Sequence, residues 1–193
     1  MKKGFTLIEV LVGGLILVIA MALIAVLYGK AAKIRTIVSG EADIQGVANQ
    51  MMDTIISGGG SPLEGLRCAT KIYQIDTSDP PLYISFGNCD GVGRKVKFQI
   101  FSTTKSLHKK KYSIGETIYS IANTDPDLDI NDKIDLQDSS RFYFYKSNEE
   151  SATTPSEVAK IMICLAAKSS LSAISRTIIL YNSVTIRNIY HID

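Results

Sequence analysis

MKKGFTLIEVLVGGLILVIAMALIAVL, residues 1–27, is the stretch that decides how the rest of the chain is interpreted. Lys2 and Lys3 lie at its start, and no charged residue follows Glu9 until Lys30. As a helix, residues 10–27 extend over roughly 27 Å, which is close to the thickness of a hydrocarbon core. The stretch therefore predicts a single membrane-spanning helix. The leading lysines predict a cytoplasmic N-terminus, with the bulk of the chain on the other side of the membrane.

Glu9 is the anomaly in this stretch, because a carboxylate inside a membrane segment is unfavourable unless a partner neutralises it. A cleaved secretory signal is one alternative, but its apolar region usually covers only about 7–15 residues and ends in small residues. Here the apolar run is longer, and the chain continues without a proline until Pro62. A plain membrane anchor is the second alternative, and it leaves Glu9 unexplained.

The segment KKGFTLIEVLV, residues 2–12, resembles the processing site of type IV prepilins and type II secretion pseudopilins. The resemblance implies that a prepilin peptidase cuts after Gly4 and methylates the new N-terminus at Phe5. Glu9 then sets the assembly register by pairing with the terminal amine of a neighbouring subunit. Residues 1–4 become a leader. The implied partners are sister major and minor pilins, an inner-membrane assembly platform and its ATPase.

An amphipathic helix, residues 29–57, is expected to continue directly from the membrane segment, residues 5–28. Its apolar side chains recur at steps of three and four, as one face of a helix requires: Ile34, Ile37, Val38, Ile44, Val47, Ala48, Met51, Met52 and Ile55. The hinge at 58–62 ends the helix, since several glycines followed by a proline cannot continue it. We expect residues 37–56 to pack on the protein's own sheet. The resemblance assigns the preceding half to subunit packing in a filament.

Residues 63–193 are expected to form a β-rich globular domain. Short runs rich in β-branched and aromatic residues, most of them bounded by turn-forming residues, predict strands at 71–75, 82–86, 96–101, 141–145 and 177–189. A further apolar run, 159–167, fits a central strand or a buried helical turn. We favour the strand, which buries Cys164. The expected fold class is α+β, with one long N-terminal helix packed on a C-terminal antiparallel sheet.

Two features favour a minor component over a major pilin. Residues 183–188, SVTIRN, resemble the end of J-type pseudopilins and related minor pilins. Major pilins of the family often carry a proline late in the apolar segment, and this chain has none there. The expected function is a minor pilin or pseudopilin of a type IV pilus, a type II secretion machine or a competence machine. A tip-located binding, adhesion or DNA-uptake module and an unprocessed single-pass anchored protein are the alternatives.

The three cysteines, Cys68, Cys89 and Cys164, form no CxxC pair, which argues against a zinc site. Cys68 and Cys89 close a loop of roughly 20 residues that a disulfide stabilises if the domain lies outside the cytoplasm. Three reduced, buried thiols are the alternative.

Catalytic motifs are missing from the sequence, including GxSxG, HExxH and a phosphate-binding glycine loop. Cys164 with His191 is the one conceivable nucleophile and base. Because Cys164 lies in a continuous apolar run, an inert thiol is the better interpretation. The sequence therefore indicates a protein that is not an enzyme and needs no cofactor, with calcium as the one candidate ion.

The calcium hypothesis rests on the acidic stretch at 124–138. Oxygen-bearing side chains lie at the spacing of a calcium-binding loop: Asp127, Asp129, Asn131, Asp135 and Asp138. Asp132 stands where such a loop has glycine, and aspartate ends it in place of glutamate. A solvated acidic connection between strands is the alternative.

The basic run LHKKKYSIG, residues 107–115, is the candidate nucleic-acid site. Its side chains provide positive charge for a phosphate backbone and an aromatic ring for a stacked base: Lys109, Lys110, Lys111 and Tyr112. The formal net charge of +2 gives no general sign of a nucleic-acid binder. The alternative is an exposed turn whose lysines discourage aggregation.

Overall fold

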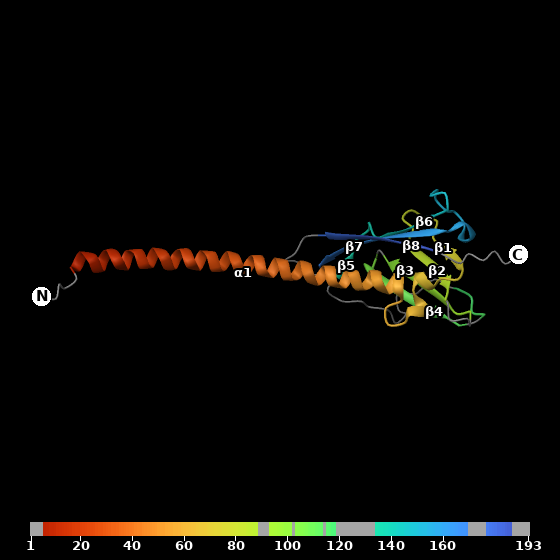
Figure 1. Ribbon diagram of the computed structural model, residues 1–193, viewed down its shortest axis with the longest axis horizontal. Helices are drawn as coiled ribbons and strands as arrows, with labels where there is room; N and C mark the ends of the chain where they lie inside the picture. Colours follow the sequence, from red (N-terminus) through yellow and green to blue (C-terminus); the bar gives the residue numbers. More distant parts are fainter. Residues whose placement is uncertain are drawn as a thin grey trace. The chain divides into compact units, whose positions relative to one another are not determined.

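The computed structural model describes residues 6–88, 93–101, 103–113, 115–118, 134–169 and 177–186. Its helix and strands are, in chain order (Figure 1), α1 (Leu7–Ser57), β1 (Ile72–Ile75), β2 (Tyr83–Gly87), β3 (Lys95–Phe101), β4 (Ser106–Tyr112), β5 (Ile134–Leu136), β6 (Arg141–Tyr145), β7 (Lys160–Ser169) and β8 (Thr177–Thr185). Three short 3-10 helices are η1 (Pro62–Glu64), η2 (Leu66–Cys68) and η3 (Pro155–Glu157). The chain divides into two units, Met1–Gly40 and Glu41–Asp193. The expected α+β fold is confirmed.

The first unit contributes the N-terminal part of α1, and residues 6–39 are all exposed. The sequence analysis expected the stripe from residue 37 onward to pack on the sheet. That expectation is wrong for its first members, because Ile37 is 37% exposed and Val38 is 58% exposed. Burial of the stripe begins only at Ile44.

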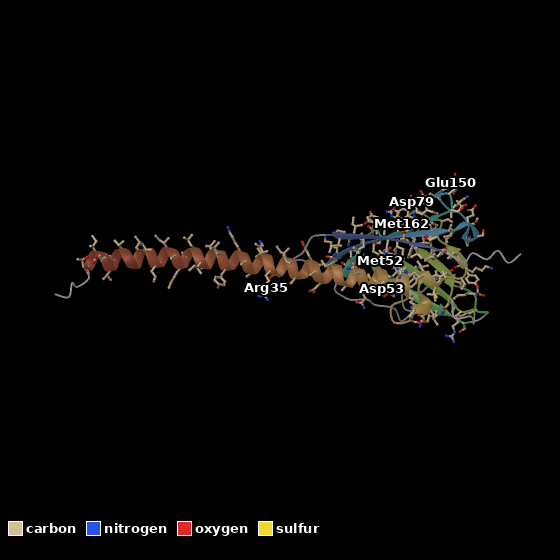
Figure 2. The ribbon with its side chains drawn as sticks, viewed as in Figure 1. Arg35, Met52, Asp53, Asp79, Glu150 and Met162 are labelled. Atoms are coloured by element: carbon tan, nitrogen blue, oxygen red, sulfur yellow. The ribbon has the colours of Figure 1, made fainter. Side chains whose placement is uncertain are left out.

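In the second unit, the C-terminal turns of α1 carry the helical part of the core. Its buried apolar residues recur at helical spacing: Ile44, Ala48, Met51, Met52, Ile55 and Ile56. Met52 is buried, whereas the next residue, Asp53, lies about 100° further around the helix and is exposed (Figure 2). This part of α1 therefore packs on the sheets as the sequence predicted.

The helix ends at Ser57, where the glycine run begins, as predicted. Gly58 has a φ of +86° and Gly59 a φ of +62°, a left-handed backbone that favours glycine. The Gly58 N–H donates to Thr54 O at 3.0 Å and so satisfies one of the free carbonyls of the last turn. A Cβ at Gly58 would lie 2.0 Å from Ser61 O, so only glycine fits this turn.

The strands form two antiparallel sheets. The first has the order β1-β2-β3-β4. In the second sheet, β7 is the central strand. β6 pairs with its N-terminal half, β5 pairs with its C-terminal end, and β8 pairs along nearly its whole length. Both sheets contribute large, fully buried side chains, among them Ile84, Phe86, Phe98, Tyr112, Phe142, Ile161, Ile163 and Leu165.

Six predicted strands are confirmed with small changes at their ends, including β7, which buries Cys164. Two strands within the described residues were missed. The basic run was expected to be a ligand site or an exposed turn, and it forms β4, the edge strand of the first sheet. The end of the acidic stretch forms β5, which pairs with β7. Neither strand was predicted from the sequence, because lysine and aspartate are uncommon in strands and weaken the apolar alternation that indicates one.

Candidate functional site

Helix α1 starts with a capping box made by Thr6 and Glu9. The Thr6 N–H and Oγ1–H both donate to Glu9 Oε2 at 2.9 Å, and the Glu9 N–H donates to Thr6 Oγ1 at 3.4 Å. Such a box satisfies free donors at a helix N-terminus, where the helix dipole also favours a carboxylate. Glu9 therefore has a local partner in the single chain, in addition to the intersubunit partner that the resemblance implies.

The sequence analysis missed this second role, although its signal is present. Threonine followed three residues later by glutamate, here in TLIE at 6–9, is the capping-box pattern. Gly4 and Phe5, the predicted processing site, lie outside the described residues, so the cleavage itself stays a prediction.

The helix surface after Glu9 is apolar on every side. No side chain of the described chain covers it, and its large exposed residues include Leu11, Leu15, Val18, Met21, Ile24 and Leu27. A segment of this length and composition can span a membrane. Burial within the described part of the chain does not account for this surface.

A pair of lysines on β4 encloses a carboxylate of η1. Lys109 Nζ lies 2.5 Å from Glu64 Oε2, and Lys111 Nζ lies 2.7 Å from Glu64 Oε1. The side chains of Lys109 and Glu64 are only 7% and 12% exposed. We call these three residues the Glu64 clamp. It holds the connection after α1 onto the edge of the first sheet, and no sequence pattern indicated it.

The strand geometry of β4 separates the four residues of the predicted nucleic-acid site. Successive side chains of a strand point to opposite faces. Lys109 and Lys111 share the face of Phe98 and Val96, their cross-strand partners, and meet Glu64. Lys110 and Tyr112 lie on the other face, with Lys110 Nζ 5.9 Å from the Tyr112 ring centre. The structure therefore does not bring the three lysines together, and DNA binding stays a prediction without further support.

The predicted calcium ligands fall mainly outside the described residues, where Asp127, Asp129 and Asn131 lie. Asp135 is in β5, opposite Lys168 of β7, and Asp138 is in the exposed turn that follows. Within the described ranges, no group of three or more histidine, cysteine, aspartate or glutamate side chains is placed to hold a metal ion. Calcium binding stays a prediction.

The cysteines divide into two kinds. Cys68 is disulfide-bonded, whereas Cys164 is a free thiol and is 3% exposed. Cys89, the predicted partner of Cys68, lies outside the described residues, as does His191.

Alkylation can test this division in the full chain. In protein from an oxidising compartment, no cysteine should react until reductant is added. Cys68 and Cys89 should then label, and Cys164 should label only after unfolding. Removing the disulfide with Cys68→Ala should lower the free energy of unfolding by about 2–4 kcal/mol. Labelling of Cys68 in the unreduced native chain would contradict the prediction, and labelling of Cys164 there would contradict its burial.

No protein-family model, curated protein or solved structure matches this chain. Any function must therefore be argued from the residues described above.

Proposed function

We propose that this chain is a minor pilin or pseudopilin. It is a structural subunit that is inserted in the cytoplasmic membrane, cleaved after Gly4 and then assembled into a filament. The observation that carries the proposal is the start of α1. A capped carboxylate, Glu9, stands four residues after Phe5 and directly before an uncovered apolar stretch of membrane length.

The mechanism of such a subunit is assembly. Before assembly, lipid covers the apolar surface of α1 and keeps the subunit in the membrane. In the filament, helices of neighbouring subunits replace the lipid. Leader removal, which precedes assembly, supplies the free amine that Glu9 of the next subunit neutralises. The domain of residues 41–193 lies outside the membrane. The expected partners are prepilin peptidase, sister pilins, the assembly platform and its ATPase.

Processing is the first test. In cells that contain a prepilin peptidase, intact-mass and N-terminal peptide measurements should show a chain that begins with methylated Phe5. A Gly4→Val chain is the matched control, and we expect it to keep residues 1–4 because the glycine at the cleavage site is lost. An uncut natural chain in those cells would refute the proposal in favour of an unprocessed single-pass anchored protein.

A further inference from the structure

Strand β8 ends the second sheet with a row of backbone groups that meet no other strand. Among the described residues β8 pairs only with β7. The Ile186 N–H donates to Ala159 O at 2.9 Å, and residues 159 and 186 stand opposite each other in the β7–β8 register. In an antiparallel ladder every second residue bonds to the partner strand. The even-numbered residues of β8 therefore bond to β7, and the odd-numbered residues direct N–H and C=O outward.

We call this outward row the β8 edge, formed by Thr177, Ile179, Tyr181, Ser183 and Thr185. One of its donors has a local acceptor, because the Ser183 N–H donates to Asn182 Oδ1 at 2.8 Å. The side chains of all five residues are exposed. In the part of the chain that the structure describes, this edge therefore pairs with no strand, and its side chains are exposed along its length.

Among the described residues, the edge strands β4 and β6 are protected in ways that β8 is not. At β4, Lys109 and Lys111 pair with Glu64 on one face and Lys110 lies on the other, so the strand carries lysine on both faces. At β6, the outward Phe142 N–H donates to Pro81 O, and the outward Phe144 O accepts from the Ala152 N–H. Residues 177–185 contain no charge and no proline, the usual devices against edge-to-edge pairing.

The side chains of β8 are also incompletely covered on both faces of the sheet. On the core side, Ile178 and Leu180 are only partly buried, although both contact the core. On the outer side, Ile179 is 49% exposed and Tyr181 is 64% exposed. A further strand would cover these four side chains and satisfy the open backbone groups at once.

We propose that an extended, uncharged segment of a partner chain adds to the β8 edge as a further strand of the second sheet. Backbone hydrogen bonds between β8 and the added segment supply the affinity. Apolar side chains of the segment cover Ile178 and Leu180 on one face of the sheet. Others cover Ile179 and Tyr181 on the other face. A charged segment fits poorly, because the edge offers no counter-ion along these nine residues.

A second copy of this chain is a poorer occupant. Two β8 strands related by a two-fold axis pair antiparallel. Within the second unit, β7 and β8 run along the direction of the α1 axis (Figure 1). In such a dimer, residues 41–57 of α1 would point in opposite directions in the two copies, whereas the subunits of one filament share a direction. This step rests on the proposed function.

Amide hydrogen exchange on the full chain tests the proposal, once in detergent micelles and once in filaments purified from host membranes. In micelles, the amides of Ile179, Tyr181 and Thr185 should exchange fast, and those of Ile178, Leu180 and Val184 should exchange slowly. In filaments, the three fast amides should slow by at least about tenfold. The even-numbered amides serve as the internal control, because β7 protects them in both states.

Substitution gives a second, independent measurement. Tyr181→Pro removes an outward donor without removing a β7–β8 hydrogen bond, whereas Tyr181→Thr shortens the side chain and keeps the donor. Tyr181→Pro should enter filaments at least about tenfold less well than Tyr181→Thr. Ile179→Lys keeps the backbone donor but adds a charge, and it should show the same loss. It tests the proposal if Tyr181→Pro disturbs the fold.

The outcomes separate the two proposals. If the natural chain is processed and enters filaments while the three amides stay fast, the strand-addition proposal is wrong and the proposed function stands. Concentration-dependent protection of the same amides in micelles would identify a second copy as the occupant and would overturn the proposal of a different partner chain. If the chain is neither processed nor assembled, both proposals fail.

Discussion

Glu9→Gln is expected to be expressed, inserted and cleaved like the natural chain, yet to enter filaments at least about tenfold less well. Glutamine keeps the acceptor that caps Thr6, because a capping box accepts glutamate or glutamine. It removes the charge that a neighbour's terminal amine requires. The measurement is the amount of variant that co-purifies with filaments or sister subunits, divided by its amount in the membrane.

Two further variants separate capping from intersubunit pairing. Glu9→Ala loses both the cap and the charge, so its defect should equal or exceed that of Glu9→Gln. Glu9→Lys places two cations together at the subunit contact and should be the most defective of the three. Thr6→Ala is the matched control. It weakens the cap and keeps the charge, so it should assemble nearly normally.

The opposite ranking would contradict the pairing role. If Glu9→Gln assembles normally and Thr6→Ala does not, Glu9 acts through the helix start that the structure shows. Register in the filament would then come from packing of the apolar helices alone.

Glu64→Gln is expected to lower the free energy of unfolding of the domain by about 3 kcal/mol or more at pH 7. The Lys109 side chain is 7% exposed and would lose its counter-ion inside the protein. Lys111 contributes less to the loss, because its side chain is 63% exposed and reaches water. Denaturant unfolding of the full chain in micelles, followed by near-ultraviolet circular dichroism, measures the change.

The same clamp should make stability fall in acid. Burial opposes ionisation of Glu64, but the hydrogen bonds and charges of Lys109 and Lys111 outweigh it, so the pKa is lowered from its ordinary 4.5. A carboxyl group whose pKa is lower in the folded state than in the unfolded state stabilises the fold at every pH above its unfolded-state pKa. This contribution is lost as the pH falls through the folded-state pKa. Glu157 acts in the same direction. Its bonds with Lys146, Thr153 and Thr154 lower its pKa to about 2.

The free energy of unfolding should therefore decrease as the pH is lowered from 4.5 to about 2. The decrease should be less steep in Glu64→Gln than in the natural chain. Glu149→Gln is the matched control, since the Lys160–Glu149 pair is 3.6 Å long and exposed, and its loss should change little. Adding Lys109→Met to Glu64→Gln should recover much of the stability, because it removes the unpaired buried charge. A Glu64→Gln chain as stable as the natural one would show that Lys109 reaches water instead.

Local patterns predicted much of this fold. The apolar run at 10–27, the stripe around Met51 and the glycine turn at Gly58 are dictated by neighbours in sequence. Helix periodicity and backbone freedom act within a few residues, so the start and end of α1 are readable without tertiary information. The same holds for β6 and β7, whose branched and aromatic residues favour strands on their own. The Thr6–Glu9 box was equally readable from the sequence, and it was missed because Glu9 was interpreted only as an intersubunit residue.

Tertiary structure decided which charges are neutralised and which strand is left open. The sequence shows three adjacent lysines at 109–111, but only the pairing of β4 with β3 sends alternate ones to opposite faces, and only the chain path after α1 brings Glu64 to two of them. Similarly, residues 177–185 read as an ordinary strand, and their position at the edge depends on β7 already pairing with β5 and β6. Such contacts join residues far apart in the chain, and no local propensity encodes their partners. The long apolar helix is therefore a property of the sequence, whereas the Glu64 clamp and the β8 edge are properties of the assembled sheets.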